Sequence, residues 1–130
     1  MRTPFRALPD GRDARPVLSV TVDDASDAPL LCLLDTGSLL TRLPDWLADE
    51  AGIDLAGAPE TETNLAGTRF SARFAHVRLA SAYGATTCGV WFCSDWPLRF
   101  GLLGQQDFLA CYRLTLSAHE QWYELAEENG

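Results

Sequence analysis

The chain has 130 residues, of which 47% are hydrophobic and 22% are charged, a composition typical of one soluble globular domain. Eighteen acidic residues against ten basic ones, all arginine, give a net charge of -8. Because phosphate binding needs clustered cations, this balance argues against a nucleic-acid partner. A chain this short cannot hold an active site built from two related halves, so a second copy must complete any such site.

The two ends of the chain are predicted to lie outside the domain. Residues 1–15 contain prolines and arginines without apolar periodicity, which predicts a flexible N-terminal arm. The domain is expected to cover residues 16–126, and residues 127–130 to form an acidic C-terminal tail. The start lacks the apolar stretch of a signal peptide and no segment reaches the length of a membrane span, so we expect a cytoplasmic location without a membrane partner.

The first half of the chain predicts two strands, a helix and a hairpin. β-branched residues over 17–22 predict a strand, and the apolar run over 29–34 predicts a second strand that is buried on both faces. A proline, early acidic residues and a final glycine predict a short helix at about 44–51. The polar stretch that follows predicts a hairpin tip over 64–67.

The second half predicts four further strands and one helix. Phe70, Ala72 and Phe74 alternate, but Val77 and Leu79 take the opposite parity, so we expect a bulge or a bend near residues 74–75 of a strand over 68–79. Strands over 85–93, 113–116 and 121–125 and a helix over 105–112 complete the chain. Short strands with only two short helices predict an all-β protein, either a barrel or a sandwich.

One segment departs from its surroundings, Leu33-Leu34-Asp35-Thr36-Gly37-Ser38. A carboxylate directly after a buried apolar strand is costly unless hydrogen-bond donors surround it. Asp35 is therefore either satisfied by backbone N–H groups of its own turn or poised for chemistry. Glycine two residues later allows a close backbone approach, and two hydroxyl side chains add donors.

This segment resembles the active-site loop of the aspartic proteases, in which an apolar pair precedes Asp-Thr-Gly-Ser or Asp-Thr-Gly-Ala. A second segment, Leu102-Leu103-Gly104 with the predicted helix after it, is similar to that family's hydrophobic-hydrophobic-glycine loop and C-terminal helix. The segments come in the same order over roughly residues 17–125. The chain thus resembles a retropepsin-like, single-domain aspartic protease of the bacterial or cellular type, which implies a closed β-barrel without a metal or other cofactor.

The resemblance also implies a homodimer. Peptide hydrolysis by this chemistry needs two carboxylates about a hydrogen bond apart: the ionised one takes a proton from water, and the protonated one binds the scissile carbonyl. The sequence has a single Asp-Thr-Gly. Asp35 is therefore expected to meet Asp35 of a second chain across a two-fold axis, with a peptide or protein as the substrate.

Supporting roles follow from the same resemblance. Thr36 would bond across the dimer axis, and the Gly37 N–H would donate to the carboxylate. Ser38 stands where viral members usually have alanine; we hypothesise that its hydroxyl donates to Asp35 and lowers the acidic limb of the pH–rate profile. Gln105 stands where viral enzymes commonly have arginine. The substrate-covering flap is expected at Asn64, Leu65, Ala66, Gly67 and Thr68, although this hairpin holds only one glycine.

Other functions have less support in the sequence. A catalytically silent dimer that binds peptides or assembles remains the alternative, because the flap departs from the family in composition. Zinc binding by Cys88 and Cys93 lacks a second ligand pair at suitable spacing. A serine hydrolase would need a Gly-x-Ser-x-Gly turn, which the chain does not contain.

Overall fold

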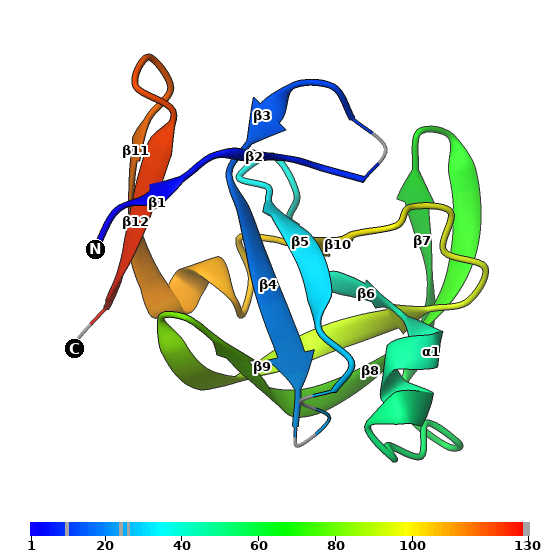
Figure 1. The fold of residues 1–130 in the computed structure, drawn as a ribbon. Helices are drawn as coiled ribbons and strands as arrows, with labels where there is room; N and C mark the ends of the chain where they lie inside the picture. Colours follow the sequence, from blue (N-terminus) through cyan, green and yellow to red (C-terminus); the bar gives the residue numbers. More distant parts are fainter. Residues whose placement is uncertain (10, 24, 26, 129–130) are drawn as a thin grey trace.

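The computed structural model describes residues 1–9, 11–23, 25 and 27–128 (Figure 1). The protein is mostly β, with 52% strand and 7% helix, and it forms a closed six-stranded β-barrel. This confirms the expected all-β class and the barrel, and it rules out the sandwich. Within the described part of the chain, no helix is both long and apolar enough to cross a membrane.

The barrel strands follow one another around a closed ring. In ring order they are β4 (Val17–Val22), β5 (Leu30–Leu34), β10 (Gly101–Leu103), β6 (Arg42–Pro44), β9 (Gly84–Cys93) and β8 (Thr68–Ser81), and β4 pairs with β8 to close the ring. β10 runs parallel to β5, with Leu103 beside Leu34. This pairing brings the end of β10 next to the end of β5, where Asp35 follows.

The long strand β8 contains no bulge in its pairing with β9, so of the bulge or bend predicted near residues 74–75 the bulge is wrong. The two strands pair without interruption over their whole register. The change of parity arises because the two halves of β8 pack in different places. Phe70 lies against Trp96, with 6.0 Å between ring centroids, whereas Val77 and Leu79 face the main core. A long twisted strand can turn opposite faces inward at its two ends.

The two predicted helices had different outcomes. Helix α1 (Asp45–Glu50) confirms the first, directly after Pro44. The second, over 105–112, is confirmed only in part: residues 105–108 form turns, and a short 3₁₀ helix, η1 (Leu109–Cys111), follows. Asp107 has a φ of 67°, which a right-handed helix cannot contain. The spacing of Phe108 and Tyr112 instead reflects their stacking in the core, 5.1 Å apart.

The remaining strands lie outside the barrel ring. β7 (Glu60–Leu65) extends the barrel sheet as a hairpin with β8. β11 (Tyr112–Ser117) and β12 (Trp122–Glu127) form the predicted closing pair, and β1 (Thr3–Pro4) joins β12. β2 (Arg6–Ala7) pairs with β3 (Ala14–Arg15). The described residues of the N-terminal arm therefore contain three two-residue strands, while its flexibility stays a prediction. The expected tail over 127–130 falls partly outside the described residues.

Because three of its thiols are buried, we expect the folded protein to lose stability against unfolding at alkaline pH. Burial raises the pKa of Cys32 and of Cys88 to about 12, and that of Cys93 to about 11, from the ordinary value of 9.0. Between pH 9 and these values the unfolded chain releases protons that the folded chain keeps. The unfolding equilibrium constant should therefore rise with pH above 9, by up to about tenfold per pH unit for each thiol.

Urea denaturation followed by tryptophan fluorescence at pH 7.5 and pH 10 measures this loss. A Cys32→Ala variant should lose less stability than the wild type over the same interval, because its thiol no longer contributes. Equal losses in the two proteins would contradict the assignment of the effect to Cys32.

Candidate active site

The loop after β5 turns tightly around the Asp35 carboxyl group. The Asp35 N–H donates to the Leu103 carbonyl at 3.0 Å, which fixes the start of the loop against β10. The Gly37 N–H donates to Asp35 Oδ1 at 3.0 Å, and the Ser38 N–H donates to the Asp35 carbonyl at 3.1 Å. Asp35 is half-buried, whereas Thr36 and Gly37 are exposed. The carboxylate therefore sits on an ordered turn and still borders solvent.

The segment around Gly104 crosses this loop at very close range. A Cβ atom on Gly104 would lie 2.2 Å from the Leu40 carbonyl oxygen and 2.8 Å from that of Ser38. Around the crossing, the Gly104 N–H donates to Thr41 Oγ1 at 3.2 Å and the Gln105 N–H donates to the Ser38 carbonyl at 2.9 Å. The structure thus brings together two segments that lie more than sixty residues apart and that the sequence singled out separately, 35–38 and 102–104.

The hydroxyl of Ser38 does not donate to Asp35, so the hypothesised effect of this side chain on the carboxylate is wrong. Its single hydrogen goes to the Leu40 carbonyl at 2.9 Å, and its oxygen accepts from Arg42 Nη2 at 3.4 Å. Ser38 is buried, and its side chain ties the loop to Leu40 and Arg42. Gln105 Nε2 donates to the Thr36 carbonyl at 2.6 Å, so a side-chain amide ties the Asp35 loop to the segment after β10.

The expected flap is a tight hairpin. Asn64 and Leu65 end β7, and Thr68 begins β8 opposite Leu65. Between them, Ala66 and Gly67 have φ values of 50° and 84°, as in the two-residue turns that suit the twist of a hairpin. The side chains around this tip are mostly exposed. The position of the hairpin tip is thus confirmed, and its closure over a substrate stays a prediction.

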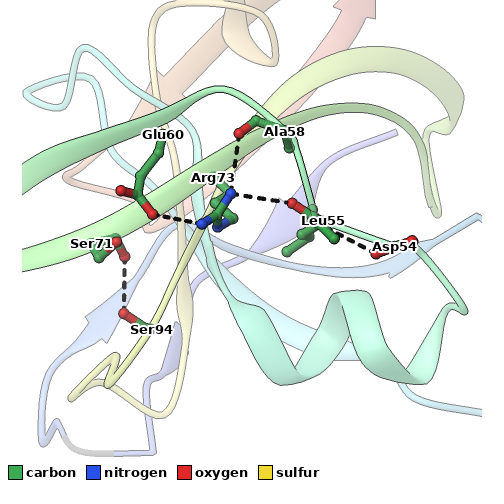
Figure 2. Close-up of polar contacts among 8 residues, drawn as sticks. Asp54, Leu55, Ala58, Glu60, Ser71, Arg73 and Ser94 are labelled. Atoms are coloured by element: carbon green, nitrogen blue, oxygen red, sulfur yellow. Dashed lines mark hydrogen bonds and ion pairs between the residues drawn. The ribbon is translucent and has the colours of Figure 1, made fainter.

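The base of the hairpin is tied to the loop before it. Figure 2 shows the Arg73 guanidinium between the Leu55 and Ala58 carbonyls, to which Nη1 donates at 3.5 and 3.3 Å, and the Glu60 carboxylate, 2.8 Å from Nη2. The Ser94 hydroxyl adds a bond to the Ser71 carbonyl at 3.2 Å. The partners are half-exposed or exposed, so each contact stabilises the protein little, but together they hold the base of the hairpin while its tip extends away.

Arg42 is a functional candidate that sequence reasoning missed. It lies in β6 with only 8% of its surface exposed. Nη1 donates to Thr63 Oγ1 at 3.1 Å and to the Asn64 carbonyl at 2.8 Å, while Nη2 reaches Ser38. The guanidinium also lies over the Trp96 ring, 5.6 Å from its centroid. One buried cation therefore links the hairpin to the loop of Asp35; a charged residue within an apolar stretch was the only signal in the sequence.

Replacing Arg42 with methionine should loosen the hairpin. Hydrogen bonds from charged donors contribute about 1.5–3 kcal/mol each, so losing those to β7 should speed amide exchange in this strand at least about tenfold. Arg69→Met is the matched control, because Arg69 lies on the same hairpin and makes an exposed ion pair with Glu62 at 3.6 Å. Hydrogen–deuterium exchange measures both variants, and equal β7 protection in the two would contradict the linking role of Arg42.

The open side of the Asp35 loop borders a cavity of about 440 Å³. Asp35 and Thr36 line it from the loop, Arg15 from the arm, and Leu116 and Gln121 from the β11–β12 hairpin. The carboxylate thus faces a space between three segments of the chain that are distant in sequence. Among the described residues, no group of three or more histidine, cysteine, aspartate or glutamate side chains is placed to hold a metal ion.

Two comparisons with known proteins found no relative: no family model matches the chain, and no curated protein matches it.

Proposed function

We propose that the chain is one half of a retropepsin-like aspartic endopeptidase, which hydrolyses peptide bonds as a homodimer without a metal or other cofactor. The observation that carries the proposal is the juxtaposition at the end of β5. There, an Asp-Thr-Gly-Ser turn with a Gly37 N–H bond to Asp35 is crossed by Leu102-Leu103-Gly104. A turn aspartate with a purely local role would not need a second segment packed this closely behind it.

The proposed chemistry uses the carboxylates of two copies of Asp35. One, ionised, takes a proton from a water molecule placed between them, and the water oxygen attacks the peptide carbonyl carbon. The other, protonated, donates to the carbonyl oxygen, so that a neutral tetrahedral diol forms. Proton transfer to the amide nitrogen then accompanies cleavage of the C–N bond. Donation from the Gly37 N–H would hold the Asp35 carboxyl group in place, and the β7–β8 hairpin would exclude bulk water.

The substrate would be an extended peptide segment with largely apolar side chains, held by β-type backbone bonds. We place the protein in the cytoplasm, because its four cysteines are free thiols, as is usual in a reducing compartment.

Mixing subunits tests the requirement for two copies of Asp35. Wild-type chain is assayed on casein alone and after equilibration with a ninefold excess of the Asp35→Asn variant. In a random mixture only about a tenth of the wild-type chains pair with each other, so activity per wild-type chain should fall about tenfold. Unchanged activity would mean that one chain cleaves alone, and sedimentation of a strict monomer at high concentration would contradict the dimer.

A catalytically silent, peptide-binding dimer is the second candidate, favoured by the single glycine of the Asn64–Thr68 hairpin. It predicts peptide binding without cleavage at any pH from strongly acidic to neutral. Cleavage of a peptide library by the wild type, lost in Asp35→Asn, would exclude it.

A further inference from the structure

The N-terminal arm inserts an apolar side chain, Leu8, into the body of the protein. Leu8 is 8% exposed, whereas its neighbours Ala7 and Pro9 are exposed. Its backbone carbonyl accepts from the Gly11 N–H at 3.0 Å, so the arm turns back directly after the inserted residue. β2 and β3, on either side of this turn, pair with each other and not with the barrel. Burial of Leu8 is therefore a main attachment of residues 6–15 to the barrel.

The residues that receive Leu8 come from the elements of the candidate active site. Leu8 clusters with Val17, Phe100 and Leu102, and partly buried side chains pack around them, including Leu33 and Leu65. We call these five receiving residues the Leu8 site. Leu33 lies two positions before Asp35, Leu65 lies at the tip of the hairpin expected to be the flap, and Leu102 belongs to the segment that crosses the Asp35 loop. The Leu8 site thus lies within the elements that a bound peptide would contact.

Two cavities border the inserted arm. A cavity of about 260 Å³ is lined by Leu8, Arg12 and Phe100 together with other residues of the arm and of the loop before β10. The cavity of about 440 Å³ contains both Arg15 and Asp35. In Figure 1 the arm, drawn in blue, crosses the end of the barrel at which β5 finishes. The arm therefore runs from the Leu8 site to the cavity that Asp35 lines, and it fills neither of the two cavities.

Charge also favours this position of the arm. Residues 1–15 carry four arginines and two aspartates, so the remaining chain has six arginines against sixteen acidic residues and a net charge of -10. A basic segment is thus attracted to an acidic body.

We propose that the Leu8 site binds an aliphatic side chain of an extended peptide that carries basic residues around it, and that the chain's own arm is its resident occupant. The inference rests on the proposed function, because it assigns a ligand class and a means of regulation to the candidate active site around Asp35. A substrate would have to displace the arm, so the protein as it stands restricts access to Asp35. The lining is aliphatic and aromatic, which favours leucine-like side chains over charged ones.

A peptide with the sequence of residues 5–15 serves as the probe, and calorimetry measures its binding to full-length chains. All chains carry Asp35→Asn, so that turnover cannot interfere. Leu8→Asp should free the site and bind the peptide at least about tenfold more tightly than the chain with Leu8, because a buried leucine no longer competes. Ala7→Asp, which adds the same charge at an exposed neighbour, should not. The peptide with aspartate in place of leucine should not bind.

Equal affinity of the Leu8→Asp and Ala7→Asp chains, or no binding to either, would overturn the proposal. A second measurement covers the case in which Leu8→Asp fails to fold. Excess peptide added to the chain with Leu8 intact should speed amide exchange in β2 and β3 by displacing the arm, and unchanged exchange would overturn it. Peptide binding without any cleavage by the wild type would instead count against the protease and leave the arm's role standing.

Discussion

Replacing Asp35 with asparagine is expected to reduce peptide hydrolysis at least about a thousandfold while the barrel stays folded. The amide cannot take a proton from water, so the pair of carboxylates loses its base. Its side-chain oxygen can still accept from the Gly37 N–H, which is 3.0 Å from Asp35 Oδ1. Because that bond survives, the turn should keep its shape, and the midpoint of urea unfolding should change little. Initial rates on a peptide library, with circular dichroism alongside, measure both effects.

Asp54 provides a matched control for this substitution. Asp54 Oδ1 accepts from the N–H two residues later, that of Ala56, at 2.9 Å, so it repeats the local bond of Asp35 without the crossing segment behind it. Asp54→Asn should leave hydrolysis within about twofold of the wild type. A loss of activity in Asp54→Asn as large as that in Asp35→Asn would show that the assay reports turn geometry and not a catalytic carboxylate.

The sequence was sufficient to locate the candidate site because its parts are local signals. A buried apolar strand that ends in Asp35, and an apolar pair followed by Gly104, can each be recognised without knowing their partner. Arg42 could not be found in this way. Its importance lies in contacts with Thr63 and Ser38 across the barrel, and a three-residue strand has no periodicity that sets one side chain apart.

The errors in the predicted elements have a similar origin. Phe108 and Tyr112 have the spacing of a helix face, yet they are spaced by their contact with each other and with the core. The parity change in β8 suggested a bulge or a bend, and the bulge is absent because one twisted strand can turn opposite faces inward at its two ends. The strands of the arm are only two residues long, which is below the length at which alternation carries information. In each case tertiary contacts outweighed the local pattern.

Substituting Gly104 with alanine is expected to have the largest effect on stability of any change that adds a single methyl group at the site. The added Cβ would lie 2.2 Å from the Leu40 carbonyl oxygen and 2.8 Å from that of Ser38. Both obstacles are backbone atoms, so no side chain can rotate away. The loop after β5 and the segment after β10 would have to separate, with loss of the bond from the Gly104 N–H to Thr41. We expect destabilisation of about 3 kcal/mol or more.

Gly11→Ala is the control for this methyl group, since its nearest contacts, all with Leu8, lie at 3.7–4.0 Å, which is ordinary packing distance. Urea unfolding should show a change below about 1 kcal/mol for Gly11→Ala and a much earlier transition, or no folded protein, for Gly104→Ala. The two variants together separate a general sensitivity to added volume from a specific need for glycine. If Gly104→Ala kept nearly wild-type stability, the loop of Asp35 would have room to shift away from β10, and the rigid crossing that supports the proposed catalytic geometry would not exist.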